Sequence, residues 1–483
     1  MILLTSLLGI WHFSVTLSRI DGQMLDANVY AITQYLAFFL LLSMADAQTK
    51  GRLIIINSVL FLILIAFFAS NSRSGTAAWL GAFGGIIVLS MFKPLYSRKT
   101  LVTVGLLSLF AFALVALLPV WFGDGSLVRG LDDLSHLNSR TYIWGATWEL
   151  IKSMPLMGYG LGTFANLYPA VRYEYGSSGV FAHNDYLQLL LEGGPLLLGL
   201  LLAYVMFYGW LGFKVFFEKN EVIERQRAEY KELLSYIAIA MALSAHAILN
   251  YVFYVLSIQI IVGVVLARTV LLARQLGYLK VPALHYRKLT FIVPCIMMIM
   301  VLSLSVLAVS RKALLHVGHF PIPEAWNESP EFAQNILTVD PDNQAANMLL
   351  FNQLFFGLSS APERQRQAMF EVSFRIGKSL MQDYPYDSDY YWRQGFLIEQ
   401  AIALGLDTHS DEEKTPEEYY QQALKLNPGN IHAIQSMFDY WLTKGDIDEV
   451  VALMDTAMKW KSLLSLDDRK LLAEMRERLE AYK

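Results

Sequence analysis

The sequence predicts an all-α protein, in which a polytopic helical membrane domain is followed by a soluble helical-repeat domain. Of its 483 residues, 55% are hydrophobic and only 17% are charged, whereas soluble domains carry about 25% charged residues. Apolar runs close to the length of a membrane-crossing helix recur along the chain. A proline-marked helical pattern repeats near the C-terminus. A simple water-soluble enzyme is therefore excluded.

The charge divides near residue 310, which places the predicted domains at 1–310 and 311–483. The first part has 21 basic and 15 acidic residues, and the second has 17 and 27, so the two parts carry net charges of +6 and −10. The single cysteine, Cys295, lies in an apolar run and cannot form an intrachain disulfide. Residues 1–13 lack the basic start and cleavage site of a signal peptide, and we expect a span there.

Nine spans are predicted when the apolar runs are compared with a hydrocarbon core about 30 Å thick. They cover residues 2–17, 29–45, 53–70, 76–92, 101–122, 195–217, 233–250, 252–273 and 289–309. Basic residues near span ends are retained in the cytoplasm. One set of alternate loops is rich in them, with Lys50, Arg52, Lys93, Arg98, Lys99, Lys214, Lys219, Arg225, Arg227, Lys231, Arg274, Lys280, Arg287 and Lys288. The other set includes the longest loop, 123–194, so we expect this loop and the C-terminal domain to be extracytoplasmic.

The C-terminal domain contains a weak internal repeat of helix, proline turn, helix and glycine. Its prolines, Pro341, Pro385 and Pro428, are 44 and 43 residues apart. Because proline ends a helix and the polar residue after it can cap the next one, each unit is predicted to form a helical hairpin. Stacked hairpins form an α-solenoid. The segment 419–428 resembles the end of a tetratricopeptide repeat, although an unrelated helical bundle stays open as an alternative.

The long loop 123–194 is the predicted functional site, because a loop of this length is uncommon unless it has a function. It contains the segments NSRTYIW at 138–144, PLMGYGLGTF at 155–164 and AHNDYLQ at 182–188, followed by EGG at 192–194. Arg140, Arg172 and His183 are its chemically active candidates.

These segments resemble the superfamily of O-antigen ligases and O-antigen polymerases, which includes bacterial protein O-oligosaccharyltransferases. The resemblance extends to SRIDG at 18–22, NSRSG at 71–75 and SAH at 244–246, and so covers about residues 18–270. It departs from the family pattern at Leu197, where members have Gly, Thr or Tyr. Members also have more spans before Arg19, so we expect further spans to precede this sequence. The resemblance implies a GT-C-like membrane fold.

The resemblance also implies a reaction, in which a glycan moves from a polyprenyl diphosphate carrier to an acceptor hydroxyl, with inversion and without a metal or other cofactor. Arginine provides fixed charged donors for a diphosphate leaving group. Arg73, Arg140 and Arg172 are therefore the predicted donor-binding residues. Histidine titrates near neutral pH and suits a base that activates the acceptor, so His183 is the predicted catalytic residue. Asn184, Tyr159 and His246 are possible supporting residues.

Each assignment has a structural alternative. A loop arginine can pair with lipid phosphate, which is the favoured interpretation for Arg19 and Arg129. His183 can cap the following helix, Tyr159 can anchor the membrane interface, and His246 can be a buried structural residue. The adjacent acids Asp132 and Asp133 are interpreted as solvated, and the glycines at 158, 160 and 162 as turn residues rather than a nucleotide loop.

A transporter and an inert scaffold are the two alternatives to a glycosyltransferase. A transporter or flippase would have more intramembrane charges and an internal duplication, and an inert scaffold would not need the motif-rich loop. Within the transferases, ligase or polymerase ranks ahead of protein O-oligosaccharyltransferase. The expected partners are the lipid-linked donor, a glycan, lipid or protein acceptor, membrane lipids and a protein bound by the C-terminal domain, with no nucleic acid. The expected location is a bacterial inner membrane.

Overall fold

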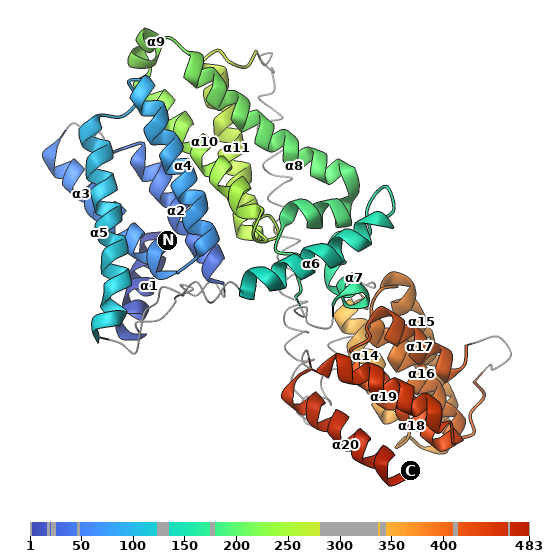
Figure 1. Cartoon of the computed structure of the whole chain (residues 1–483). Helices are drawn as coiled ribbons and strands as arrows, with labels where there is room; N and C mark the ends of the chain where they lie inside the picture. Colours follow the sequence, from blue (N-terminus) through green and yellow to red (C-terminus); the bar gives the residue numbers. More distant parts are fainter. Residues whose placement is uncertain are drawn as a thin grey trace. The chain divides into compact units, whose positions relative to one another are not determined.

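The structure is a computed structural model that describes residues 2–16, 20, 26–45, 49–122, 135–173, 179–280, 337–338, 344–408, 414–461 and 464–482. Every regular element in these ranges is a helix (Figure 1). The predicted all-α class is therefore confirmed. Several sequence predictions lie outside the described residues: Arg19, Arg129, Asp132, Asp133, Cys295, Pro341 and the span 289–309.

The membrane helices follow the predicted spans. They are α1 (Ile2–Thr16), α2 (Ala27–Leu42), α3 (Lys50–Ala69), α4 (Arg73–Phe92), α5 (Arg98–Phe122), α8 (Asp185–Phe217), α10 (Arg227–Ala247) and α11 (Leu256–Gln275), with the short α9 (Asn220–Arg225) before α10. Within the described ranges, α3, α4, α5, α8 and α11 are long and apolar enough to cross a membrane. The protein is therefore a multi-pass membrane protein.

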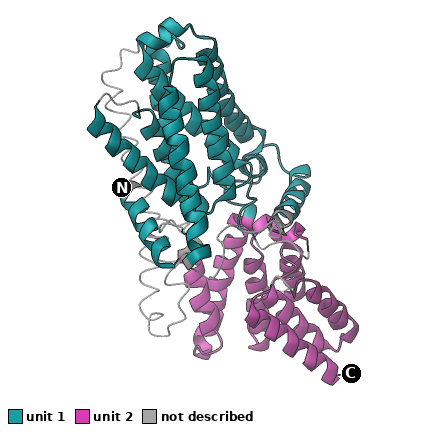
Figure 2. Cartoon of the chain, turned by 60° about the vertical axis from the view of Figure 1, so that its left-hand side comes forward, with its two compact units in different colours: residues 1–164, 179–282 teal, residues 165–178, 283–483 magenta. Residues whose placement is uncertain are grey.

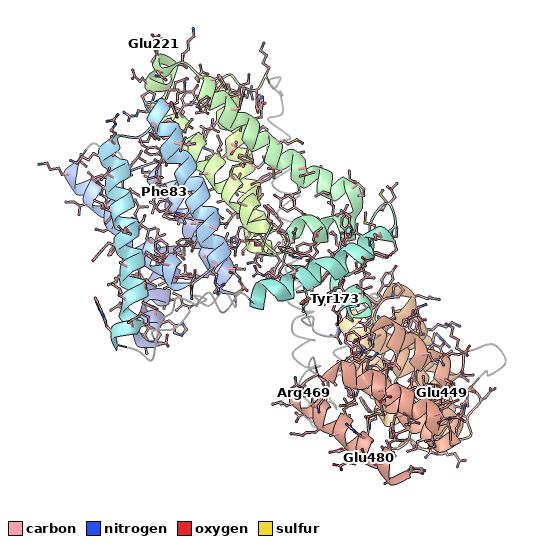
Figure 3. The ribbon with its side chains drawn as sticks, viewed as in Figure 1. Phe83, Tyr173, Glu221, Glu449, Arg469 and Glu480 are labelled. Carbon is pink, nitrogen blue, oxygen red and sulfur yellow. The ribbon has the colours of Figure 1, made fainter. Side chains whose placement is uncertain are left out.

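The bundle is organised around α10, which packs against α2, α4, α8 and α11, while α3 packs against α1, α2 and α5. Aromatic rings fill its interior. Phe83 of α4, labelled in Figure 3, lies 5.4 Å from Phe38 of α2 and 5.3 Å from Trp79, measured between ring centroids. All three rings are almost completely buried. Burial of such large rings against one another stabilises the bundle.

The basic loops meet at one end of this bundle. The Lys93 ammonium donates to the Glu218 carbonyl over 2.6 Å, and Arg227 donates to the Leu95 carbonyl over 2.8 Å. The Tyr278 hydroxyl donates to the Glu218 carboxylate over 2.9 Å. Loops that the charge pattern placed on one side of the membrane are thus brought together. The opposite end of the bundle holds the beginnings of α2, α4 and α8.

The described part of the long loop is largely helical. It contains α6 (Ser135–Lys152) and α7 (Phe164–Val171), and α8 begins at Asp185, ten residues before the predicted start of the span. The prediction placed the membrane span at the apolar run from residue 195 and expected the helix after His183 to begin at Asn184. The structure has a break at Gly194, whose φ of 65° and ψ of −170° are not helical. A short helical segment therefore precedes the membrane part of α8.

The chain forms two compact units (Figure 2). Unit 1 comprises residues 1–164 and 179–282, and unit 2 comprises residues 165–178 and 283–483. Unit 2 contains α14 (Gln344–Gly357), α15 (Glu363–Asp383), α16 (Ser388–Ala403), α17 (Pro416–Leu426), α18 (Ile431–Lys444), α19 (Ile447–Lys459) and α20 (Leu466–Tyr482). Part of the long loop thus belongs to the same compact unit as the C-terminal helices.

Consecutive helices of unit 2 pack against one another, and α18 also contacts α16 and α20. The hairpin of α17 and α18 has the predicted turn: α17 ends at Leu426, Pro428 lies in the turn, and Asn430 caps α18 by accepting from the Ala433 amide. The helix ends at Gly445 in the left-handed conformation, as glycine at a helix end permits. Sequential helical hairpins are the architecture of this unit.

Candidate functional site

His183 lies at the start of α8 with a strained backbone. Its φ is 51°, and among the described non-glycine residues only Asn71, in the NSRSG segment, also has a positive φ. Such a conformation costs a non-glycine residue about 1 kcal/mol or more, and it persists where neighbours hold the chain firmly. Those neighbours are hydrogen-bonded. Asn184 caps α8 by accepting from the Leu187 amide, and the Ala182 amide donates to Gln188.

The helix α6 brings Arg140 towards His183. Trp144, one turn after Arg140 and so on the same face of the helix, donates its indole N–H to the Ala182 carbonyl over 2.9 Å. This bond holds the chain immediately before His183 against α6. Arg140 is half-buried and acts electrostatically on the His183 imidazole. The structure therefore brings together two of the predicted site residues.

Residues 250–254, between α10 and α11, connect the parts of the site, and we call them the connecting segment. Its contacts are Asn250 with His246 (3.4 Å), Tyr251 with Asp26 (2.8 Å), the amides of Val252 and Phe253 with Asp185 (both 2.7 Å), and Tyr254 with Glu192 (2.8 Å). The connecting segment therefore joins the beginning of α2, the end of α10 and the first turns of α8.

His246 is fully buried at the end of α10. Its Nε2 lies 2.9 Å from the Ser74 hydroxyl, and its Nδ1 lies 3.5 Å from the Tyr35 hydroxyl. Asn250 completes the contacts of Nε2. Both ring nitrogens therefore have partners in the interior, as expected of a structural histidine within a membrane bundle.

Arg73 is the first residue of α4, beside Ser74. Ser72 caps the helix by accepting from the Gly75 amide over 3.1 Å, and its hydroxyl donates to Asn28 over 2.8 Å. Arg73 itself lines a cleft of about 350 Å³ together with residues from α3, α4 and α5. The chain of contacts from Ser74 through His246 and Asn250 links the start of α4 to the connecting segment.

The glycine run folds against the break in α8. Glu192 is buried and accepts hydrogen bonds from the amides of Gly162 (2.9 Å) and Phe164 (3.0 Å). Gly158 and Gly194 both have positive φ, and a Cβ on either would clash with backbone atoms of the other segment. These glycines permit a close approach of two backbones, so the turn interpretation is the one that the geometry supports.

Tyr159 lies in this turn and away from the imidazole contacts. Its amide donates to the Leu191 carbonyl over 3.0 Å, and its hydroxyl is 3.2 Å from the Ser153 hydroxyl. The contacts of Asn184 are those of a helix cap. Both supporting residues therefore shape the loop, while their role in substrate binding stays a prediction.

Arg172 belongs to unit 2, whereas Arg140 and His183 belong to unit 1. Its guanidinium lies 3.4 Å from the Asn427 side-chain oxygen and 5.2 Å from the centroid of the Trp460 ring. Nearby, Asn166 of α7 donates to Asp387 over 3.4 Å. These contacts hold the segment with Asn166 and Arg172 against the C-terminal helices. Donor binding by Arg172 stays a prediction.

The surroundings of His183 keep its imidazole neutral. Burial lowers the pKa of this side chain below its ordinary value of 6.5, and the positive charge of Arg140 lowers the pKa further. A hydrogen bond with Asn250 and the negative charge of Asp26 act in the opposite sense. The ring Nδ1 is buried without a hydrogen-bond partner among the described residues. A neutral imidazole is the form that accepts a proton.

The fold and the site define a multi-pass membrane protein whose long loop carries a histidine and an arginine at one end of the helical bundle. Residues 58–204 match the model of the O-antigen ligase family. The matched range contains Arg73, Arg140 and His183. This match supports the O-antigen ligase superfamily, and with it a membrane glycosyltransferase of the ligase type. No curated protein and no solved structure matches the chain.

Sequence reasoning missed the buried acids and tyrosines that hold the site together. Asp185 and Glu192 are almost completely buried, and both bond to the connecting segment. One signal was available: two acidic residues next to a long apolar run must find partners when they enter a membrane. Their partners in the connecting segment, 60 and more residues later, follow from the tertiary fold and have no local signature.

Proposed function

We propose that the protein transfers a glycan from a polyprenyl diphosphate carrier to an acceptor hydroxyl in an O-antigen ligase- or polymerase-type reaction. The observation that carries this proposal is that His183 lies within electrostatic reach of Arg140 and that its Nδ1 lacks a hydrogen-bond partner among the described residues, inside the range that the family model matches. The site lies at the end of the bundle opposite the basic loops, which favours an extracytoplasmic site in a bacterial inner membrane.

In the proposed reaction the acceptor oxygen attacks the anomeric carbon as the bond to the diphosphate oxygen breaks. The hydroxyl proton passes to the His183 imidazole, which becomes positively charged. The leaving diphosphate gains one negative charge, and Arg140 and Arg73 stabilise it through charge-assisted hydrogen bonds. The reaction proceeds with inversion and needs no metal in this scheme, since the arginines supply the positive charge.

The unit 2 helices have a proposed role outside the chemical step. Their sequential hairpins support a tetratricopeptide-like domain, an architecture suited to binding a protein or positioning an acceptor. Because the acceptor distinguishes a ligase from a polymerase or a protein O-oligosaccharyltransferase, the acceptor that supports turnover names the subtype.

The test measures release of polyprenyl diphosphate from a lipid-linked glycan by the purified full-length protein, with candidate acceptors. We expect acceptor-dependent release that falls by about 10²–10⁴-fold in His183→Ala and in Arg140→Ala, as for the loss of a general base or a charge-stabilising group. Tyr230→Phe is the matched control, because its hydroxyl bonds to Tyr278 at the other end of the bundle. Full activity in both site variants would overturn the proposed site.

A further inference from the structure

Asp26 joins the beginning of α2 to the connecting segment. One carboxylate oxygen accepts from the amides of Asn28 (2.7 Å) and Val29 (3.0 Å) and so caps α2. The other accepts from the Tyr251 hydroxyl over 2.8 Å. Both oxygens of Asp26 are therefore engaged, and the carboxylate fixes the hydroxyl end of the Tyr251 side chain.

The Tyr251 ring in turn supports the chain that carries His183. It stacks on Phe181 at a centroid distance of 4.4 Å and an interplanar angle of 19°. It meets the His183 imidazole edge-on at 5.3 Å and 61°. The Tyr251 ring thus contacts both Phe181, two positions before His183, and His183 itself, where the backbone φ is strained. Aromatic pairs of this geometry are favourable, so the Tyr251 ring stabilises the position of the imidazole.

We propose that Asp26 and Tyr251 are positioning residues for His183. Tyr251 holds the imidazole in the orientation that receives the proton of the acceptor, and the Asp26 carboxylate holds Tyr251 and stabilises the imidazolium that the proton transfer creates. This inference rests on the proposed role of His183 as the base, and it gives roles to two residues outside the range that the family model matches.

The charges around His183 make the effect of Asp26 predictable. Arg140 on α6 opposes protonation, and Asp26 at the start of α2 favours it. Asn250 is neutral, and Asp185 of α8 directs one oxygen to the amides of Val252 and Phe253. Removing the Asp26 charge therefore leaves Arg140 unopposed and lowers the pKa of His183 further. A weaker base accepts the proton less readily in the transition state.

The experiment compares Asp26→Asn and Tyr251→Phe with wild type in the release assay over a range of pH. Asparagine is as good a helix cap as aspartate, so Asp26→Asn removes the charge and keeps α2 capped. We expect kcat to fall by about threefold to tenfold in both variants, with KM for the donor unchanged. In Asp26→Asn the acid limb of the profile moves to lower pH by about half a unit. Asp387→Asn, a capping aspartate in unit 2, is the control and keeps the wild-type limb.

An acid limb that stays at the wild-type pH in Asp26→Asn, or a wild-type kcat in both variants, overturns the inference. His183→Ala, measured alongside, separates this failure from that of the proposed function. If His183→Ala is inactive while both positioning variants match wild type, only the inference fails. If His183→Ala is fully active, the proposed base itself is wrong.

Discussion

The surroundings of His183 and His246 differ, although the two histidines lie at the same end of the bundle and share Asn250 as a neighbour. His246 is fully buried, and each of its ring nitrogens has a partner. His183 is half-buried, its backbone is strained, and its buried Nδ1 has no hydrogen-bond partner among the described residues. A polar residue in a membrane protein can thus serve packing or chemistry. Satisfied ring nitrogens indicate a structural role for His246, and the unpartnered nitrogen favours a chemical role for His183.

The largest expected effect contrasts the two histidines directly. His183→Ala should lower transfer by about 10²–10⁴-fold with little change in thermal unfolding. His246→Ala leaves Ser74 and Tyr35 without a buried partner and should lower the free energy of unfolding by about 1–3 kcal/mol. Unfolding in detergent, followed by circular dichroism, measures the second effect. A larger loss of stability in His183→Ala than in His246→Ala would contradict the contrast.

Gly194→Ala should destabilise the turn beside the site, because it strains the backbone at the break in α8. Its φ is positive, and the new methyl group would meet the Leu156 carbonyl, so a loss of about 2–4 kcal/mol in unfolding free energy is expected. Gly199→Ala, further along α8 and with open space around its Cβ, should be neutral or slightly stabilising. Equal melting temperatures for the two variants would show that the turn tolerates the change.

The pH dependence of the reaction tests whether His183 acts in its neutral form. Because His183 must be neutral to accept a proton and its pKa lies below 6.5, kcat/KM should stay level from pH 8 down to 6.5. It should fall only at lower pH, as the imidazole becomes protonated. The profile of the wild-type enzyme between pH 4.5 and 8 measures this. An acid inflexion at or above 6.5 would contradict the expected environment.

The smallest expected effect concerns Arg172 in unit 2. If the contact between the Arg172 guanidinium and the Trp460 ring stabilises the loop, Arg172→Ala and Trp460→Ala should each lower the stability of the protein by about 0.5–2 kcal/mol. The double variant should lose less than the sum, since the two side chains share one contact. Thermal unfolding of the four proteins gives the coupling. If Arg172→Ala abolishes transfer while Trp460→Ala has wild-type activity, Arg172 binds the donor as the sequence analysis predicted.

The sequence predicted the helices better than it predicted their connections. Apolar runs and proline turns are local, so they predicted the eight long helices described in the bundle and the hairpin around Pro428, with errors at the helix ends. The helix expected after His183 agrees with the start of α8, whereas the apolar run marked only the part of α8 that follows the break at Gly194. Local signals mark where a helix is interrupted and do not say whether the chain resumes as the same element.

The candidate site was predictable only where it has short motifs. His183 and Arg140 were predicted from the loop segments, and the structure places them within electrostatic reach of each other, while their roles stay predictions. Asp26 and Tyr251 were missed because their contact joins residues 225 positions apart. Arg172 was grouped with Arg73 and Arg140 because all three lie on the extracytoplasmic side of the predicted topology, yet the segment that carries Arg172 belongs to unit 2. Position along a loop does not predict which compact unit the segment joins.

The segment 165–178 has a consequence for the order in which the protein is made. The Asn427 partner of Arg172 follows it by 255 residues, and at about 5–20 residues per second a ribosome needs roughly 13–50 s to reach it. Until then the segment has no C-terminal helices on which to fold, although the helices of unit 1 on both sides of it have been synthesised. The loop therefore completes its structure late, after the membrane bundle has been inserted.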